Sequence, residues 1–266
     1  MAYKDQQIIL ITGAASGLGW VLTEAYVELG HTVVMADIQQ ELLEERARSL
    51  ASSRVTTIAM DITISADIER LVGLIQDQFG RLDTLINNAG ITHRSLIEKT
   101  NPDVFHKVMA VDYQGPVELA LAALPLLKQS RGLIINVSSM AGWMPVLGRA
   151  GYCAAKSALH QFFEVMRCEV KQHGVNIMMV YPSFLDTPIE KNALGGDGQQ
   201  AGHQRTMVGK IGTAESVADA IVKAHQDGKK RVFPDKFTWF ASVLYKLLPG
   251  VFLRSMSKKF ADELKQ

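Results

Sequence analysis

Short apolar runs alternate with longer amphipathic segments along the chain. The runs are three to six residues long and rich in Ile, Val and Leu, which is typical of buried β-strands. The seven expected strands are Ile8–Thr12, Thr32–Ala36, Val55–Ala59, Thr84–Asn87, Leu133–Val137, Asn176–Tyr181 and Arg231–Phe233.

Segments of helical length and period separate these runs. The clearest are Leu18–Leu29, Ala66–Phe79, Asp103–Leu127, Ala154–His173 and Glu215–His225. Such β-α-β alternation favours a parallel sheet with right-handed crossovers, because the intervening helices must cover both of its faces. We therefore predict an α/β fold, a doubly wound parallel sheet of about seven strands with helices on both faces.

The domain organisation follows from the length of the chain after the sixth strand. A stretch rich in Gly and Gln, Leu194–Gly202, is expected to be a mobile loop, since too few residues follow it to build a second domain. We predict one domain over residues 1–266, with a loop over about residues 187–210 that covers the substrate.

Composition limits the classes of binding partner and the cellular compartment that are expected for the protein. The 28 basic and 27 acidic residues form no long run of one sign, so nucleic acid is not an expected partner. Cys153 and Cys168 lie about 22 Å apart on one expected helix, too far to form a disulfide. The apolar run after the polar residues 1–7 is too short for a signal peptide. We predict a cytoplasmic protein with a small-molecule substrate.

The seven histidines form no metal-ligand cluster, so no metal is expected, and most of these side chains should be exposed.

A glycine-rich turn joins the first strand to the first helix. It reads Gly13-Ala-Ala-Ser-Gly17-Leu-Gly19. The first glycine permits a tight turn, the second lets the backbone approach a pyrophosphate, and the third allows close packing of the helix. The helix N-terminus offers N–H groups and a positive dipole end to phosphates. The pattern predicts a dinucleotide here, and the alternative is an ordinary strand-to-helix turn.

An acidic residue, Asp37, ends the second strand about twenty residues after this turn, where it can accept hydrogen bonds from both adenosine ribose hydroxyls. A 2′-phosphate would meet a like charge there. Neither Arg nor Lys stands at Ala14, Ala15, Ser16 or Ile38 to offset that charge. We therefore predict NAD as the cofactor in preference to NADP. The alternative is that Asp37 caps the next helix.

Four motifs together resemble the short-chain dehydrogenase/reductase family in its single-domain form. They are Thr12-Gly13-x-x-x-Gly17-x-Gly19, Asn87-Asn-Ala-Gly90, Ser139 and Tyr152-x-x-x-Lys156, and the resemblance extends to Thr187. It implies a Rossmann-like fold and hydride transfer between a nicotinamide cofactor and an alcohol or carbonyl compound. It also implies a homodimer or homotetramer built partly on the helix Tyr152–His173.

The glycine turn and the resemblance together imply a set of cofactor contacts. Asp61 and Ile62 would contact the adenine, residues 88–90 would pass behind the ribose, and Pro182 and Thr187 would contact the nicotinamide side. Ser183 stands where the family usually has Gly. The expected cofactor residues are Gly13, Ser16, Gly17, Leu18, Gly19, Asp37, Ile38, Asp61, Ile62, Asn88, Ala89, Gly90, Tyr152, Lys156, Pro182 and Thr187.

The candidate acid/base is Tyr152. A free tyrosine has a pKa of about 10, too high for a base at neutral pH. Lys156 follows one helical turn later on the same face, where its ammonium and the positive nicotinamide favour the phenolate. The resemblance adds that Lys156 holds the nicotinamide ribose. The alternative is a surface pair on a helix.

Ser139, thirteen residues before Tyr152 and just after a buried strand, is expected to hydrogen-bond the substrate oxygen. Ser138 is the alternative candidate for this role. We expect the Ser138 side chain to point to the opposite side of the backbone and to bond local backbone groups. The residues between Ser139 and Tyr152 suggest an apolar substrate wall, with core packing as the alternative for each. They are Met140, Trp143, Met144, Val146 and Leu147.

Asp112 departs from the family pattern. Similar enzymes carry Asn at this position, where it joins the catalytic set through a local break in the helix and a water that links the lysine to solvent. We expect Asp112 to preserve that proton relay and to raise the pKa of Tyr152 by its charge. The alternative is that Asp112 turns away and caps a helical turn.

The C-terminal segment, about residues 237–266, begins with a stretch more apolar and aromatic than a solvated tail. Lys246 and the Pro249-Gly250 pair leave it short of the roughly twenty apolar residues that span a bilayer. In order of preference, we expect it to pack over the substrate pocket, to form a subunit contact or to attach peripherally to a membrane.

The sequence thus predicts an NAD-dependent oxidoreductase acting on a hydrophobic secondary alcohol or ketone. A catalytically weak nucleotide-binding sensor or partner subunit is the alternative, and the presence of Ser139, Tyr152 and Lys156 argues against it. An epimerase or dehydratase of the longer branch would need a larger C-terminal domain. The substrate stays open among an apolar ring system, a fatty chain, a sugar alcohol and a β-keto thioester.

Overall fold

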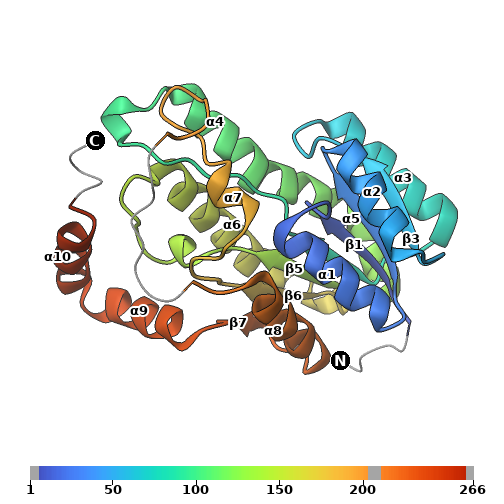
Figure 1. Cartoon of the computed structure of the whole chain (residues 1–266). Coiled ribbons are helices and arrows are strands. Elements are labelled where there is room, and N and C mark those ends of the chain that lie inside the picture. Colours follow the sequence, from blue (N-terminus) through green and yellow to red (C-terminus); the bar gives the residue numbers. More distant parts are fainter. Residues whose placement is uncertain (1–5, 203–210, 262–266) are drawn as a thin grey trace.

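A computed structural model describes residues 6–202 and 211–261. It contains a parallel sheet of seven strands in the order β3-β2-β1-β4-β5-β6-β7, with helices on both sides (Figure 1). This confirms the predicted fold class. The strands are β1 Ile8–Thr12, β2 Thr32–Asp37, β3 Val55–Ala59, β4 Thr84–Asn87, β5 Leu133–Val137, β6 Asn176–Val180 and β7 Arg231–Val232.

The helices include α2, α7, α9 and α10, which go beyond those expected from periodicity. The α-helices are α1 Gly17–Glu28, α2 Gln40–Leu50, α3 Ser65–Phe79, α4 Pro102–Met109, α5 Gly115–Ser130, α6 Ala150–Glu169, α7 Pro188–Lys191, α8 Ala214–Gln226, α9 Lys236–Leu247 and α10 Pro249–Lys259. Single 3-10 turns lie at Ile97–Lys99, Met140–Gly142 and Lys171–His173.

Successive residues of each strand feed two separate cores. In β1, Leu10 packs with residues of α3, α5 and α6, while Ile9 and Ile11 pack with residues of α1, α2 and α8. Side chains alternate between the faces of a strand, so a sheet buried on both sides needs apolar residues at nearly every position. The unbroken apolar runs in the sequence have this cause.

The helix expected over Asp103–Leu127 is interrupted. α4 and α5 are joined by a π-helical turn, Ala110–Gln114. Pro116 has no N–H with which to bond the carbonyl of Asp112, four residues earlier, so the regular α-helical ladder cannot run through this point. The turn lies at the position where the family resemblance implied a break in the helix.

The stretch Leu194–Gly202, expected to be mobile, is bonded to the loop after β4. Leu194 N–H donates to Thr92 O at 2.9 Å, Arg94 N–H donates to Leu194 O at 2.7 Å, and Asn101 N–H donates to Gly196 O at 2.8 Å. These backbone bonds give it a fixed place, because the carbonyls and amides of two segments satisfy each other. Residues 203–210 of the predicted loop lie outside the described residues.

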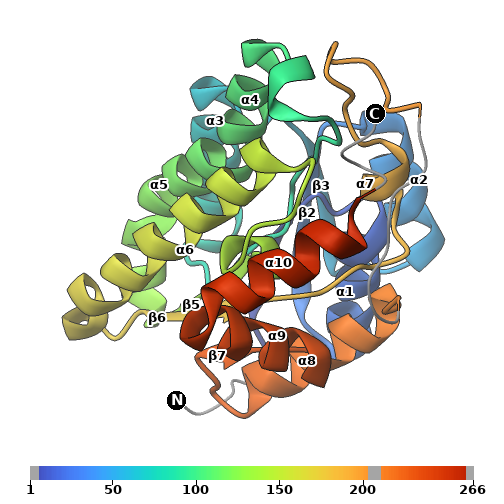
Figure 2. The same cartoon turned by 90° about the vertical axis from the view of Figure 1, so that its left-hand side faces the viewer.

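The C-terminal segment packs on the rest of the domain through its second helix. Phe252 and Met256 of α10 and Phe260, which directly follows it, lie at helical spacing and pack with Val146 and Phe184. Figure 2 shows α10 lying across the front of the domain with α9 below it. Within residues 6–202 and 211–261, no helix is long and apolar enough to cross a membrane. Residues 262–266 lie outside the described part of the chain.

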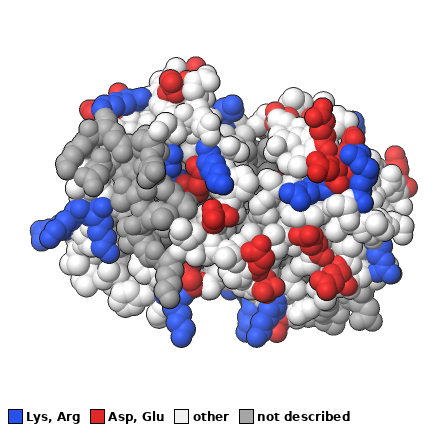
Figure 3. Space-filling model, viewed as in Figure 1, with Lys and Arg blue, Asp and Glu red and all other residues white. Residues whose placement is uncertain are grey.

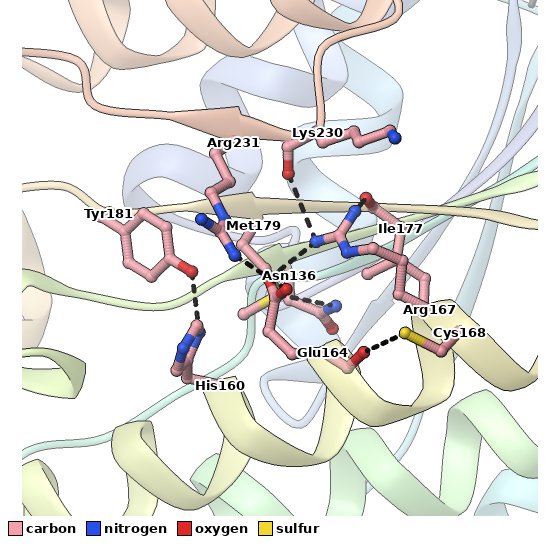
Figure 4. A network of polar contacts seen from close by, with 10 residues as sticks. All are labelled: Asn136, His160, Glu164, Arg167, Cys168, Ile177, Met179, Tyr181, Lys230 and Arg231. Atoms are coloured by element: carbon pink, nitrogen blue, oxygen red, sulfur yellow. Dashed lines mark hydrogen bonds and ion pairs between the residues drawn. The ribbon is translucent and has the colours of Figure 1, made fainter.

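A polar and aromatic network ties the β6–β7 edge of the sheet to α6 (Figure 4). Glu164 on α6 accepts hydrogen bonds from Arg167 and Arg231, each at 2.9 Å, and Arg167 also donates to the carbonyl of Ile177. Tyr181 at the end of β6 bonds His160 Nδ1 at 2.8 Å. These contacts join α6 to β6 and to β7, the strand after which the chain continues into α9.

Candidate active site

A pocket lies at the carboxyl ends of the strands. It is lined by the loops that follow β1 to β6 and by the first turns of α6 and α7. The sheet order reverses between β1 and β4, and ligands of open α/β sheets bind outside this switch point. The pocket thus occupies the position that its topology favours for a ligand.

The glycine turn forms a cradle that only glycine can make. Gly13 and Gly17 have φ values of +65° and +53°, in the left-handed region. A Cβ on Gly13 would lie 2.9 Å from Ala89 Cα, and a Cβ on Gly19 would lie 2.0 Å from Gly13 O. Gly13 and Gly17 line the pocket, whereas Gly19 packs α1 against the turn. The open N-terminus of α1 fits the pyrophosphate of a dinucleotide.

Thr12, the last residue of β1, joins this turn to the loop after β4. Its hydroxyl accepts hydrogen bonds from Asn88 N–H and Ala89 N–H, both at 3.1 Å. The Asn88 side chain donates to Thr12 O at 3.0 Å. Thr12 is the first residue of the glycine motif, and the sequence signal for this bridging role is a hydroxyl at the end of a buried strand.

Asp37 ends β2 at the far end of the pocket from α6. Its carboxylate accepts hydrogen bonds from Ala15 N–H and Gln39 N–H, each at 3.0 Å. The cap position of α2 belongs to Gln39, so the alternative that Asp37 caps this helix is wrong. Ile38 beside it is 66% exposed and lines the same end.

Nearly all the expected site residues surround this one pocket. Gly19 and Asp112 are the two that do not line it. The lining includes Gly13, Ser16, Gly17, Leu18, Asp37, Ile38, Asp61, Ile62, Asn88, Ala89, Gly90, Ser139, Tyr152, Lys156, Pro182 and Thr187.

Tyr152 and Lys156 occupy successive turns of α6. The Lys156 Nζ lies 5.7 Å from the centroid of the Tyr152 ring and donates a hydrogen bond to Val137 O at 3.2 Å. The Lys156 side chain is only 5% exposed. The alternative of a surface pair is therefore wrong, because the ammonium lies inside the pocket wall.

Asp112 lies directly behind Lys156. Its Oδ2 is 3.1 Å from Lys156 Nζ, and its Oδ1 accepts a hydrogen bond from Ile91 N–H at 2.8 Å. The π-helical turn directs this buried side chain inward, so the alternative that it turns away is wrong. Burial raises the pKa of Asp112, and the charge of Lys156 opposes that rise.

The three buried groups act on one another. Burial acts to lower the pKa of Lys156, but Asp112 and Tyr152 outweigh it and raise that pKa. Burial raises the pKa of Tyr152, the charge of Lys156 lowers it, and that of Asp112 raises it again. The net effect is a pKa above the ordinary value of tyrosine. Tyr152 is therefore a phenol at neutral pH, and an added positive charge beside it would lower its pKa.

Two serines follow β5 and differ in their contacts. Ser139 caps the 3-10 turn Met140–Gly142, and its hydroxyl accepts a hydrogen bond from Ala141 N–H at 3.2 Å. The Ser139 hydroxyl also lowers the pKa of Tyr152. The Ser138 hydroxyl is buried and has no hydrogen-bond partner among the described residues, so it does not bond the backbone as expected.

The apolar wall differs from the expected one. Met140 and Val146 line the pocket, whereas Trp143, Met144 and Leu147 do not. Trp143 packs instead on His160 and Tyr181, with ring centroids 4.6 and 5.3 Å away. The remaining wall comes from residues after β4 and β6 that the sequence did not single out. These are Ile91, Phe184, Leu185 and Ile189.

An ion pair at the pocket wall was also unexpected. Arg149, three residues before Tyr152, donates hydrogen bonds to Glu190 Oε2 at 2.7 Å and to Thr92 Oγ1 at 2.9 Å. Both charged side chains are largely buried. The pair joins α6 to α7, and its only signal in the sequence was an arginine near the tyrosine.

The histidines are more buried than expected. His31, His93, His160 and His225 are all buried. Burial, with the nearby charge of Arg149, lowers the pKa of His93 to about 4, so this ring is neutral at pH 7. Its Nε2 accepts a hydrogen bond from Gly151 N–H at 2.9 Å and thereby supports the first turn of α6.

Comparisons of the sequence agree with this geometry. Residues 7–196 match the family described as short chain dehydrogenase. The chain is 33% identical to Dehydrogenase/reductase SDR family member 7B of Bos taurus, in an alignment covering 99% of this chain and 84% of that protein. It is 30% identical to 11-beta-hydroxysteroid dehydrogenase A of Sesamum indicum, with 92% and 77% covered.

Solved structures share the fold. A short chain dehydrogenase/reductase from Burkholderia phymatum in complex with NAD has a TM-score of 0.83 at 21% identity, with 94% of this chain and 96% of that one covered. A short chain dehydrogenase from Burkholderia cenocepacia in complex with NADP has a TM-score of 0.81 at 25% identity, with 95% and 98% covered. With the family match over residues 7–196, the chain belongs to the short chain dehydrogenase family of oxidoreductases.

Proposed function

We propose that the chain transfers a hydride between NAD(H) and a hydrophobic secondary alcohol or ketone. The observation that carries the proposal is the placement of Ser139, Tyr152 and Lys156 in the same pocket as the glycine cradle and Asp37. A nucleotide extended from Asp37 to α6 would place its reactive end beside Tyr152. NAD supplies the hydride acceptor, and the reduced cofactor supplies the donor.

The protein residues would handle the proton. In oxidation, the Tyr152 phenolate takes the proton of the substrate hydroxyl, and in reduction its phenol returns that proton to the carbonyl oxygen. Ser139 would donate a hydrogen bond to the same oxygen. The Lys156 ammonium has three N–H donors, which allows one for Asp112, one for Val137 O and one for the nicotinamide ribose.

The wall beside these residues favours an apolar substrate. Val146 and Phe184 line the pocket and also belong to the apolar cluster that α10 covers. A sugar alcohol would leave hydroxyl groups unpaired against this surface, which costs binding free energy. We further propose a homodimer or homotetramer, since Leu121 and Val165 are exposed on α5 and α6.

A panel of secondary alcohols with NAD, and of ketones with NADH, tests the function. The absorbance of NADH reports turnover, and the highest kcat/KM should fall on compounds with an apolar body. Tight NADH binding with no turnover across the panel would favour the sensor instead. Greater activity on sugar alcohols would contradict the proposed substrate class.

NAD should be preferred over NADP by at least about tenfold in kcat/KM, about 1.4 kcal/mol. Asp37 is held by Ala15 and Gln39. The two cations that line the pocket are Arg149, at the N-cap of α6, and Lys156, within α6, and both lie at the other end. A 2′-phosphate would therefore be repelled and unpaired. The double variant Asp37→Ser/Ile38→Arg should shift the ratio toward NADP. Equal or higher kcat/KM with NADP in the unchanged chain would refute the assignment.

A further inference from the structure

The segment α9–α10 has an inner and an outer surface of different character. Phe252 and Met256 of α10 and Phe260 at its C-cap face inward and join the apolar cluster that contains the pocket residues Val146 and Phe184. Tyr245 of α9 packs against Phe252 with ring centroids 5.2 Å apart. The inner surface of the segment is therefore already covered by the domain itself.

The outer surface is unusually apolar. Fourteen large apolar side chains are exposed in the described residues, and seven of these fall within residues 237–253. Phe240 and Leu247, seven residues apart on one face of α9, are 61% and 71% exposed. A concentration of this kind marks an interaction surface, because single exposed apolar residues are normally scattered.

The charged residues of α9 and α10 are all basic. Residues 236–261 contain five of the 28 basic residues of the chain and none of its 27 acidic ones, and Asp235 and the pair Asp262-Glu263 flank this range. On α10, Arg254 and Lys258 lie with Val251 on the face opposite the inner stripe, and all three are exposed. In Figure 3 blue side chains stand among white ones at the lower left, where α9 and α10 lie in Figure 1.

We propose that this outer surface of α9–α10 binds the face of an anionic lipid bilayer. An aromatic and apolar face bordered by Lys and Arg is the composition of helices that lie in the membrane interface. A second copy of the chain fits less well, because a two-fold contact would oppose identical groups of five positive charges. Anionic headgroups complement these charges, and the apolar side chains enter the acyl boundary between them.

Binding of the full-length chain to lipid vesicles tests this proposal, without cofactor or substrate, so that catalysis does not affect the result. Sedimentation with vesicles of phosphatidylcholine alone should leave the protein in solution. Vesicles with about 30% phosphatidylserine should bind it at low salt, and about 0.5 M NaCl should release most of it by screening. Absence of binding to the anionic vesicles would overturn the proposal.

Matched variants locate the binding surface. Phe240→Ser/Lys246→Glu on α9 and Arg254→Glu/Lys258→Glu on α10 should each lower the vesicle partition coefficient at least about tenfold. Ile97→Ser/Lys99→Glu makes the same kinds of change on exposed positions of the 3-10 turn Ile97–Lys99 and should change it less than about twofold. Thermal melts identify any variant that fails to fold. In that case the salt dependence of vesicle binding by the unchanged chain still tests the proposal.

Two results would assign the surface differently. Vesicle binding retained by both C-terminal variants would place the lipid site elsewhere and contradict the proposal. A dimer in light scattering that Phe240→Ser/Lys246→Glu dissociates, in a chain that binds no vesicles, would assign the surface to a second copy.

Discussion

Tyr152→Phe should lower kcat at least about a thousandfold in both directions while leaving NADH affinity within about twofold. Proton transfer by a positioned side chain contributes roughly a hundred- to ten-thousandfold to a rate, and no other described side chain combines a titratable O–H with a place beside Ser139 and Lys156. The lost hydroxyl holds no part of the glycine cradle, so the dinucleotide should still bind. Stopped-flow turnover and NADH fluorescence titration measure the two quantities.

Tyr113→Phe provides the matched control. Tyr113 packs against Phe162 with ring centroids 6.3 Å apart and does not line the pocket, so removal of its hydroxyl should leave turnover unchanged. If Tyr152→Phe keeps a rate near that of the unchanged chain, the acid/base role of Tyr152 is wrong.

Asp112→Ala should be the most damaging change behind the pocket wall. It leaves the buried Lys156 ammonium without its carboxylate, and breaking a buried ion pair in this way costs about 3–5 kcal/mol of unfolding free energy. Turnover should fall at least about a hundredfold, because Lys156 also loses the group that fixes its position. Chemical denaturation and kcat/KM measure the two effects. A variant with unchanged stability would show that Lys156 gains nothing from Asp112.

Asp112→Asn should retain substantial activity, because the amide has nearly the same shape as the carboxylate. The variant removes only the negative charge at this position. The charge of Asp112 raises the pKa of Tyr152, so the neutral amide should lower it. Alcohol oxidation needs the phenolate, and its rate rises as pH passes the tyrosine pKa. The rising limb should therefore move to lower pH in the variant, as a property of the coupled groups. An unchanged pH profile would mean that Asp112 does not influence the Tyr152 proton.

The sheet and the pocket residues around the glycine turn were predictable because their signals are local. A strand buried on both faces must be apolar throughout, and the turn after β1 needs glycine where φ is positive, at Gly13 and Gly17. Asp112 was predicted to couple to Lys156 from its place in a motif. The π-helical turn that brings them together lies just before Pro116, whose missing N–H removes one bond of the regular helix and was not considered in the sequence.

The end of the pocket near Arg149 and Phe184 depends on contacts that no local pattern in the sequence encodes. Arg149 meets Glu190 across 41 residues, and α10 reaches the pocket wall from the end of the chain. Trp143 was expected in the wall because of its position between Ser139 and Tyr152. It turns away because Tyr181 and His160 form an aromatic cluster at the sheet edge. Whether a side chain faces the pocket or packs in the core depends on which other side chains fill the neighbouring space.

The Arg149–Glu190 pair has a kinetic consequence. It anchors one end of α7, and the backbone bonds between Leu194 and the loop after β4 anchor the residues that follow. In the proposed function, a nucleotide bound against Thr187 would leave past α7 and the residues that follow it. The frequency with which this segment moves aside would then limit turnover, whatever the speed of proton and hydride transfer. Stronger contacts at the Arg149–Glu190 pair or at Leu194 would lengthen the residence time of the product complex and slow turnover.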